Sequence, residues 1–282
     1  MAIPIPKSAA PKGKHESPSV GEPLKIKKGR VEGQGERIGI YGSGGIGKTE
    51  LAAGLKVVGI NPVFIDLDSG SSGLDVDRIG YGDNLSFQDI RSFLQADYWH
   101  GDYGAVVIDT FTALEEIIAE HVIEFVPHEK ATKTVNNLED YGWGKGQVHV
   151  FEHALLVLQD LDALARKGIH VIVICHQVAE RVPSAESEDY LEYQPRMQSP
   201  NKTAKIRERV FEWTNHFFRV DHDRAVTDGK AIKADSRSIF TVRNTTSWAK
   251  HRTLASGKQM PDRVDYEKGS VELWKIMFGG NE

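Results

Sequence analysis

The sequence has a single cysteine, Cys175, among its 282 residues, so no disulfide can form within the chain. Such low cysteine usage is typical of a reducing compartment, and we expect a cytoplasmic location. No apolar run is long enough to cross a bilayer, and the amino-terminal segment lacks the apolar stretch of a secretory signal. We therefore expect no membrane partner. Cys175 itself falls inside an apolar run, which indicates a small core residue.

Positive charge is scarce beyond the first residues of the chain. Residues 1–34 carry seven Lys and Arg against three Glu, a net charge of +4, and the whole chain has a formal charge of −5, so the rest sums to −9. Such an acidic chain is not expected to coat duplex DNA indiscriminately. The basic segment is rich in Pro, Ser, Gly and Lys without apolar periodicity. This composition predicts a flexible tail over residues 1–34 and one folded domain over residues 35–282.

A glycine-rich turn stands between an apolar run and a helical pattern in residues 36–59, which read ERIGIYGSGGIGKTELAAGLKVVG. The turn matches G-x-x-x-x-G-K-[ST], ending in Lys48 and Thr49. Glycines allow backbone N–H groups to curl around a phosphate, and the start of a helix adds partial positive charge. Lys48 is expected at the β- and γ-phosphates, and the Thr49 hydroxyl at Mg²⁺. The expected binding loop consists of Gly42, Ser43, Gly44, Gly45, Ile46, Gly47, Lys48, Thr49 and Glu50.

Three further apolar runs end in polar residues, at the strand ends where ligands bind in parallel sheets. They are PVFIDLDSG (62–70), YGAVVIDTFTAL (103–114) and GIHVIVICHQ (168–177). Helical patterns alternate with these runs: SFQDIRSFLQAD, FTALEEIIAEHVIEF and VHVFEHALLVLQDLDALARKG. This alternation predicts an α/β fold with a mostly parallel, doubly wound sheet.

The strand-end residues are candidate catalytic and metal-binding groups. Asp109 has the position of a Walker B carboxylate that holds Mg²⁺ through water, although a strand-end capping role stays open. Asp68 is a candidate base for an attacking water, but Asp66 or Asp68 could instead cap the turn that follows. Gln177 is the candidate γ-phosphate sensor, while His176 is equally consistent with a sensor and with an ordinary strand-end residue. The other histidines lack paired ligand spacing, so no zinc site is expected.

These motifs together resemble the RecA-like ATPase fold, and more closely the phage RecA-like ATP-binding proteins of the single-strand annealing recombinase group. The likeness covers about residues 36–265. It implies a RecA-like P-loop NTPase core with ATP and Mg²⁺ as ligands. It also implies that Asp68 is the catalytic carboxylate, where RecA-like proteins usually have glutamate, and that His176-Gln177 couples the γ-phosphate to a DNA-binding loop. If a phage encodes the chain, the location is the host cytoplasm.

The segment DYGWGKGQ (140–147) also resembles a segment of the phage group. Its glycines permit a mobile loop, in which Trp143 and Lys145 could meet a base and a phosphate of single-stranded DNA. A single-strand-binding protein is a further candidate partner.

About thirty residues after Gln177 contain no apolar run, and so long a loop is usually functional or disordered. Its first half is acidic, which weighs against strong DNA binding. Its second half carries two tyrosines and five cations: Tyr190, Tyr193, Arg196, Lys202, Lys205, Arg207 and Arg209. Aromatic rings beside cations suit single-stranded DNA, and the loop at this position contacts such DNA in RecA-like proteins. The alternative is a solvated loop that leads into a helix with a charged face.

Two extended runs then follow, joined by Asp228-Gly229, which predicts a β-hairpin near the end of the sheet. Lys250 and Arg252 come next, in the stretch SWAKHRTL. In hexameric RecA-like ATPases a K-x-R pair at this place reaches the γ-phosphate of the neighbouring subunit, as an arginine finger does. The resemblance thus implies that the pair acts in trans and that the chain assembles with itself head to tail, as a ring or filament. An ordinary basic strand end is the alternative.

The sequence therefore predicts a DNA-dependent ATPase that forms ADP and phosphate, binds single-stranded DNA and acts in phage-type homologous recombination by strand annealing. Three alternatives stay open: a small-molecule kinase, a module that binds ATP without hydrolysing it because Asp68 is short, and a DNA motor or helicase-type ATPase without annealing activity. Near the end of the chain, Leu273, Trp274 and Met277 are expected either to dock a last helix or to lie at a subunit interface.

Overall fold

The computed structural model describes residues 33–279 except 131, 184–187, 201–202, 228–229 and 255, and gives only the backbone of residues 224–235. The predicted tail over residues 1–34 therefore falls outside the described part, apart from its last two residues. No helix in the described part of the chain is long and apolar enough to cross a membrane.

The described strands form one nine-stranded sheet in the order β3-β2-β4-β5-β1-β7-β8-β9, with β6 paired to β5 outside this path. Their bounds are β1 (Arg37–Gly42), β2 (Pro62–Asp66), β3 (Asp77–Ile79), β4 (Ala105–Asp109), β5 (His170–Val182), β6 (Tyr190–Pro195), β7 (His216–Thr227), β8 (Lys230–Phe240) and β9 (Arg263–Asp265). The pairs among β1 to β5, and the pair β1–β7, are parallel. The mostly parallel sheet predicted from the sequence is thus confirmed.

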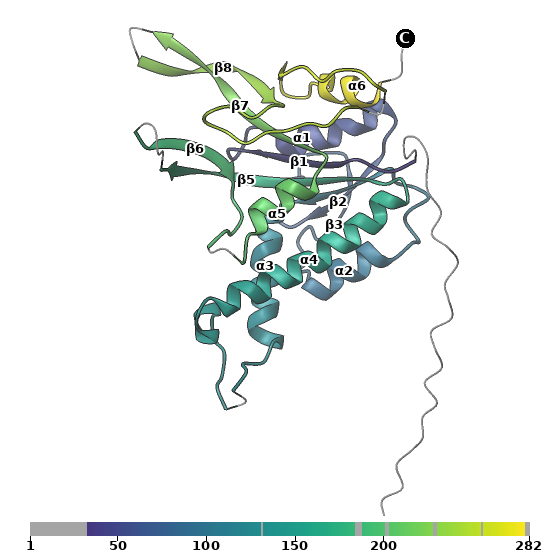
Figure 1. Cartoon of the computed structure of the whole chain (residues 1–282). Coiled ribbons are helices and arrows are strands. Elements are labelled where there is room, and N and C mark those ends of the chain that lie inside the picture. Colours follow the sequence, from purple (N-terminus) through teal and green to yellow (C-terminus); the bar gives the residue numbers. More distant parts are fainter. Residues whose placement is uncertain are drawn as a thin grey trace, which may run out of the picture. The chain divides into compact units, whose positions relative to one another are not determined.

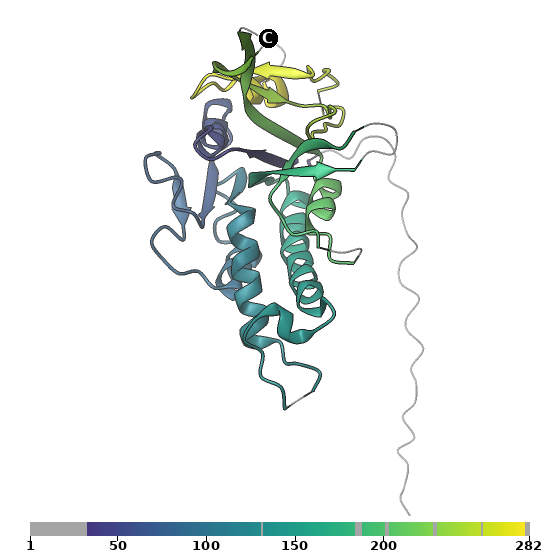
Figure 2. The same ribbon diagram turned by 90° about the vertical axis from the view of Figure 1, so that its left-hand side faces the viewer.

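Helices cover both faces of this sheet, which makes the fold doubly wound. The helices are α1 (Lys48–Ala53), α2 (Phe87–Gln95), α3 (Phe111–Phe125), α4 (Lys145–Arg166), α5 (Ile206–Trp213) and α6 (Glu272–Phe278), with the 3₁₀ turns η1 (Gly54–Val58) and η2 (Leu138–Tyr141). Figure 1 shows α1 and α6 on one face and α2, α3 and α4 on the other, and Figure 2 shows α3 and α4 side by side. The predicted helical patterns each form a helix.

The alternation of side chains along the central strands divides the core into two clusters. On β4, Val106 and Ile108 pack with α2, α3 and α4, while Ala105 and Val107 pack with α1 and α6. A strand buried on both faces needs apolar residues at every position, which explains the continuous apolar run in the sequence. Cys175 is fully buried in the first cluster, as predicted for a core residue.

Two strands continue beyond the carboxyl edge of the parallel sheet and form hairpins that project on the same side (Figure 1). β5 pairs with β6 from Gln177 onward, and β7 pairs with β8 from Arg219 onward. The predicted β7–β8 hairpin is confirmed, although its turn lies outside the described residues. The expectation of a long loop without secondary structure after Gln177 is wrong in part. β6 escaped detection because the residues on its buried face include Glu192 and Gln194, which are polar.

The last helix docks onto the chain itself. The Trp274 indole donates to the Leu51 carbonyl oxygen of α1 at 2.6 Å, and Leu273 and Met277 are buried in the same cluster. Of the two roles expected for these side chains, the structure therefore shows intramolecular docking.

Candidate functional site

The glycine-rich turn follows β1 and leads into α1, as predicted. Gly42 has no room for a side chain, because a Cβ there would lie 2.3 Å from the Val220 carbonyl oxygen. Gly47 closes the turn with φ of 104°, a left-handed conformation that favours glycine. The Lys48 ammonium is buried and donates to the carbonyl oxygens of Gly42 at 3.0 Å and Ser43 at 2.9 Å. Burial lowers the pKa of Lys48, so an anion at the turn would stabilise its charged form.

The other predicted loop residues surround this turn. Gly44 and Gly45 are exposed at its tip, whereas Ile46 is anchored in the core. Glu50 lies in the first turn of α1, where its carboxylate is 3.6 Å from the Lys268 ammonium. The loop is thus fixed at its base and open at its tip.

Thr49 and Asp109 meet where α1 approaches the end of β4. Thr49 Oγ1 donates to Asp109 Oδ2 at 2.7 Å, and Asp109 is 2% exposed. Burial raises the pKa of Asp109 to about 6, an effect that a bound cation would oppose. Gly70 borders this corner, because a Cβ there would make ordinary contacts of 3.5 Å with both oxygens. A hydroxyl and a carboxylate are oxygen ligands that suit Mg²⁺, so these residues fit the metal. Sequence reasoning named the pair but missed Gly70.

The two aspartates after β2 have different surroundings. Asp66 is fully buried, and its carboxylate accepts two backbone N–H groups of the following turn, at 3.0 and 3.1 Å, as well as the Ser71 hydroxyl. Asp68 accepts from Thr110 Oγ1 at 2.8 Å and lies 3.1 Å from His176 Nε2. The turn-capping role therefore belongs to Asp66, and Asp68 faces the end of β4 and β5.

His176 and Gln177 are consecutive on β5, so their side chains point to opposite faces. His176 contacts Asp68, and its backbone N–H donates to Thr112 Oγ1 at 3.1 Å. Gln177 Oε1 accepts from Arg219 Nε at 3.1 Å. The structure thus brings His176 to the candidate catalytic carboxylate and Gln177 to Arg219. The sensor role of Gln177 stays a prediction.

Residues from the last part of the chain support the loop, and sequence reasoning missed them. The Tyr266 hydroxyl donates to the Gly47 carbonyl oxygen at 2.7 Å, and Arg237 Nη1 donates to that of Ile46 at 3.1 Å. These contacts hold the two carbonyl groups whose peptide units carry the N–H groups of Gly47 and Lys48, the end of the expected phosphate loop. Because the acceptors are backbone atoms far away in the sequence, no motif marks the donors.

Lys250 and Arg252 lie towards the amino edge of the sheet, whereas the glycine-rich turn lies at the carboxyl edge. Lys250 pairs with Phe217 in an isolated antiparallel bridge, and the chain continues to Arg252, which lines a cavity with Arg37. The Lys250 ammonium sits 4.9 Å from the Phe211 ring centroid. Burial, reinforced by the charge of Arg252, lowers the pKa of Lys250 to about 8. This position is remote from the turn of the same chain.

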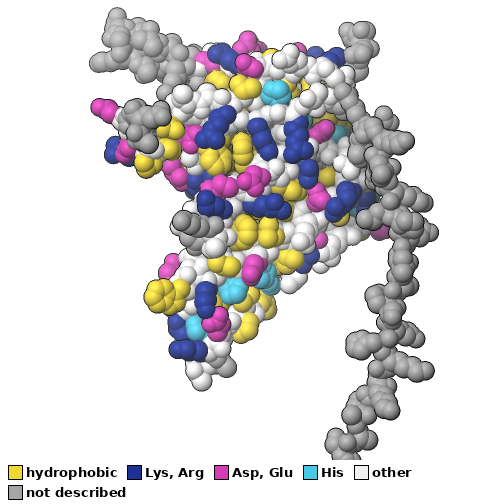
Figure 3. Space-filling model, in the orientation of Figure 1, with side chains coloured by type: hydrophobic (Ala, Val, Ile, Leu, Met, Phe, Trp, Pro, Cys, Tyr) yellow, Lys and Arg dark blue, Asp and Glu magenta, His cyan; other side chains and the backbone are white. Residues whose placement is uncertain are grey.

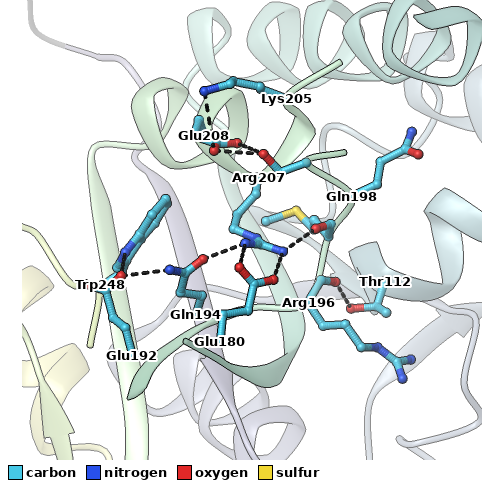
Figure 4. A network of polar contacts seen from close by, with 12 residues as sticks. Thr112, Glu180, Glu192, Gln194, Arg196, Gln198, Lys205, Arg207, Glu208 and Trp248 are labelled. Carbon is cyan, nitrogen blue, oxygen red and sulfur yellow. Dashed lines mark hydrogen bonds and ion pairs between the residues drawn. The ribbon is translucent and has the colours of Figure 1, made fainter. Parts of the chain in front are cut away.

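The cations expected at a DNA contact include both buried and exposed side chains. Arg207 is 7% exposed, and its guanidinium donates to the Glu180 carboxylate at 2.7 and 2.9 Å, to Gln194 and to the Met197 carbonyl oxygen (Figure 4). It is an internal ion-pair partner, contrary to the expectation of a surface cation. The Arg196 side chain is 55% exposed. Figure 3 shows further Lys and Arg side chains over the face that carries α5.

Trp143 is the most exposed apolar side chain of the described residues, at 100%. Its φ is 53°, between Gly142 and Gly144, each with φ of 72°. Lys145, at the start of α4, forms an ion pair with Glu129 at 2.6 Å. The structure therefore places the ring of Trp143 fully in solvent, two residues before a lysine that is paired with Glu129.

Lys48 and the Thr49–Asp109 pair converge on one turn, at the edge where α/β sheets bind ligands. The chain is a P-loop NTPase by fold and by site. It belongs to the AAA domain family, whose profile matches residues 34–253. A similar solved structure is a KaiC-like protein from the hyperthermophilic archaeon Pyrococcus horikoshii OT3, with a TM-score of 0.40 and 10% identity, covering 83% of this chain and 91% of that chain. No curated protein matches the sequence.

Proposed function

We propose that this P-loop NTPase hydrolyses ATP to ADP and phosphate with Mg²⁺, and that it binds single-stranded DNA as a head-to-tail oligomer. The position of Asp68 is the observation that supports the proposed hydrolysis. Its carboxylate is held by Thr110 and His176 beside the Thr49–Asp109 pair, while Asp66 alone caps the neighbouring turn.

In the proposed hydrolysis, each residue of the site has a separate role. Lys48 exchanges its two loop carbonyls for the β- and γ-phosphate oxygens, and Thr49 and Asp109 hold Mg²⁺. When bound, Mg²⁺ neutralises charge on these phosphates. Asp68 orients a water for attack on the γ-phosphorus and accepts its proton, while the bond from the γ-phosphorus to the bridging oxygen breaks. Gln177 is proposed as the γ-phosphate sensor, with Arg219 as its link to β7.

Lys250 and Arg252 are proposed to complete the site of a neighbouring copy. Their place at the amino edge supports action in trans, because the turn of the same chain lies at the other edge. Charge supports it too. Residues 66–83, which lead away from the phosphate site, contain five Asp and one Arg, a net charge of −4, which would attract a cationic face of the next copy.

Single-stranded DNA is the proposed polymer partner, in homologous recombination of the phage single-strand annealing type, with a single-strand-binding protein as a candidate accessory. The exposed Arg196 and the solvent-facing ring of Trp143 support it, since phosphates and bases bind such groups. A small-molecule kinase is less well supported. Its arginine lid would have to come from residues 196–209, where the buried Arg207 is fixed in an ion pair with Glu180.

Steady-state ATP hydrolysis tests the proposal, with and without a single-stranded oligonucleotide, on wild type, Lys48→Ala and Asp109→Asn. We expect DNA to stimulate the wild type and either substitution to reduce kcat at least about 100-fold. Transfer of the γ-phosphate to a nucleoside would establish a kinase instead. Binding without turnover would establish an ATP-binding module, and DNA-stimulated strand displacement a motor. An undiminished rate in Asp109→Asn would refute the metal assignment.

A further inference from the structure

We propose that Glu192 of β6 is a positioning residue for Lys250, the first cation of the Lys250–Arg252 pair. This inference rests on the proposed action of that pair in trans. Glu192 touches neither cation, and it lies far from both in the sequence. It acts through the aromatic side chains that lie between Glu192 and Lys250.

Glu192 is a buried carboxylate with three donors. It is 3% exposed, and Oε2 accepts from Trp248 Nε1 at 2.8 Å and from Gln194 Nε2 at 2.7 Å (Figure 4). Oε1 accepts from Arg243 Nη2 at 2.9 Å. Two of the donors come from the segment that leads to Lys250, so one carboxylate fixes that segment twice.

The indole held by Glu192 begins a series of ring contacts that ends at Lys250. The Trp248 ring centroid lies 5.0 Å from that of Phe211, and the Lys250 ammonium lies 4.9 Å from the Phe211 centroid on α5. The Glu192–Trp248 hydrogen bond sets the ring orientation, and the ring position in turn sets the surface on which the ammonium rests. A change at Glu192 is therefore transmitted to the Lys250 ammonium, and Glu192 is not itself one of the residues proposed to bind nucleotide.

The backbone around Trp248 is also tied to the phosphate-loop strand. The Tyr41 hydroxyl, one residue before the loop, donates to the carbonyl oxygens of Trp248 at 2.7 Å and Tyr193 at 3.0 Å. Arg219, which binds Gln177, stacks over the Tyr193 ring at 4.2 Å. Within one chain, β6 therefore contacts both groups of interest. Tyr193 lies against Arg219, which binds the candidate sensor Gln177, and Glu192 holds the segment that leads to Lys250.

Subunit mixing with the full-length chain tests the inference. Glu192→Gln keeps the side-chain size but replaces an acceptor oxygen by an amide that donates. Alone, this variant should lose roughly 10- to 100-fold in kcat with the KM for ATP unchanged, because its own phosphate loop is intact and only Lys250 is misplaced. Mixed with Lys48→Ala, it should recover activity, because the Lys48→Ala copy presents an intact pair to the Glu192→Gln phosphate loop.

Two comparisons separate this inference from the proposed function. Lys250→Ala/Arg252→Ala mixed with Lys48→Ala should recover activity in the same way, and failure to do so would refute action in trans and the role of Glu192 with it. If that mixture recovers activity, two results would overturn the role of Glu192 alone. One is a wild-type kcat for Glu192→Gln by itself, and the other is no recovery when Glu192→Gln is mixed with Lys48→Ala. Asp189→Asn removes an exposed carboxylate of the same hairpin and should leave kcat unchanged.

A milder variant covers the case in which Glu192→Gln does not fold, as judged by thermal denaturation. Trp248→Phe removes the indole N–H and keeps a ring against Phe211. It should lower kcat several-fold, leave the KM for ATP unchanged and recover when mixed with Lys48→Ala. A wild-type kcat in Trp248→Phe would overturn the proposed path.

Discussion

The Thr49 hydroxyl lies 2.7 Å from Asp109 Oδ2, although 60 residues separate the two in the sequence. They come from the first turn of α1 and the end of β4, and β5 runs between the strands that lead to them. The parallel sheet brings them together because both β1 and β4 end at its carboxyl edge. The contact joins two oxygen atoms that suit one Mg²⁺ ion.

Thr49 substitutions test this pair. Thr49→Ala removes the hydroxyl and should lower kcat/KM for Mg²⁺-ATP at least about 100-fold, because the metal loses a ligand beside Asp109. Thr49→Ser keeps the hydroxyl and should stay within roughly tenfold of wild type. Hydrolysis measured over a range of Mg²⁺ concentrations checks both. Equal losses in the two variants would contradict a metal role for the hydroxyl.

The two aspartates after β2 should respond in opposite ways to the same change. Asp68→Asn should abolish hydrolysis while the melting temperature stays near wild type, because its contacts are few and partly exposed. Asp66→Asn should cost about 2 kcal/mol of stability, because the buried carboxylate accepts three donors of the turn. Thermal denaturation and single-turnover hydrolysis distinguish them. A stable but inactive Asp66→Asn would reverse the assignment.

Arg196 and Arg207 should also separate stability from DNA binding. Arg207→Ala leaves buried acceptors at Gln194 and Met197 unpaired and should destabilise the fold by about 3 kcal/mol. Arg196→Ala should change stability by no more than about 0.5 kcal/mol and weaken oligonucleotide binding. Fluorescence anisotropy with a labelled single strand measures the DNA affinity, and denaturant unfolding measures the stability. Unchanged affinity in Arg196→Ala would remove this residue from the proposed DNA contact.

Glu115 should make stability depend on pH. Burial raises its pKa to about 7, against the two hydrogen bonds from the Gln198 N–H at 2.8 and 3.1 Å, which lower it. Because the folded pKa is above the unfolded one, the folded state binds more protons, and stability falls as the pH rises from about 4.5 through 7. Glu115→Gln escapes this loss, so its advantage over wild type should grow between pH 5 and pH 8, by at most about 3 kcal/mol. The exposed Glu116→Gln serves as the control, and a constant difference across this range would contradict the prediction.

Tyr266→Phe tests the support of the phosphate loop by the C-terminal part of the chain. The substitution removes only the hydroxyl that donates to Gly47, leaving that carbonyl without this donor. We expect a loss of about 1 kcal/mol in stability and a several-fold rise in the KM for ATP, because the loop backbone is held less firmly. Denaturant unfolding and steady-state kinetics measure these effects. An unchanged KM would show that the loop keeps its shape without this bond.

The sequence was most informative where one local pattern has one physical use. The G-x-x-x-x-G-K-T turn predicted Lys48 and Thr49 at the site, and the apolar runs predicted β2, β4 and β5, because strands buried on both faces need apolar residues throughout. The sequence was misleading where polar side chains occupy buried positions. Residues 190–195 lack the apolar pattern of a strand because Glu192 and Gln194 fill the buried positions of β6. The sequence predicts a surface cation at Arg207 because its partners come from other elements.

The sequence by itself therefore determined the class of fold, the phosphate loop and the set of strand-end candidates, since each depends on residues close together in the chain. Only the tertiary structure decided where each candidate lies and what it contacts. It assigned the turn cap to Asp66 and left Asp68 beside His176, and it placed Lys250 and Arg252 at the opposite edge from their own loop. It also brought Tyr266 to Gly47. Such assignments depend on distances between residues that are far apart in the sequence, and packing sets those distances.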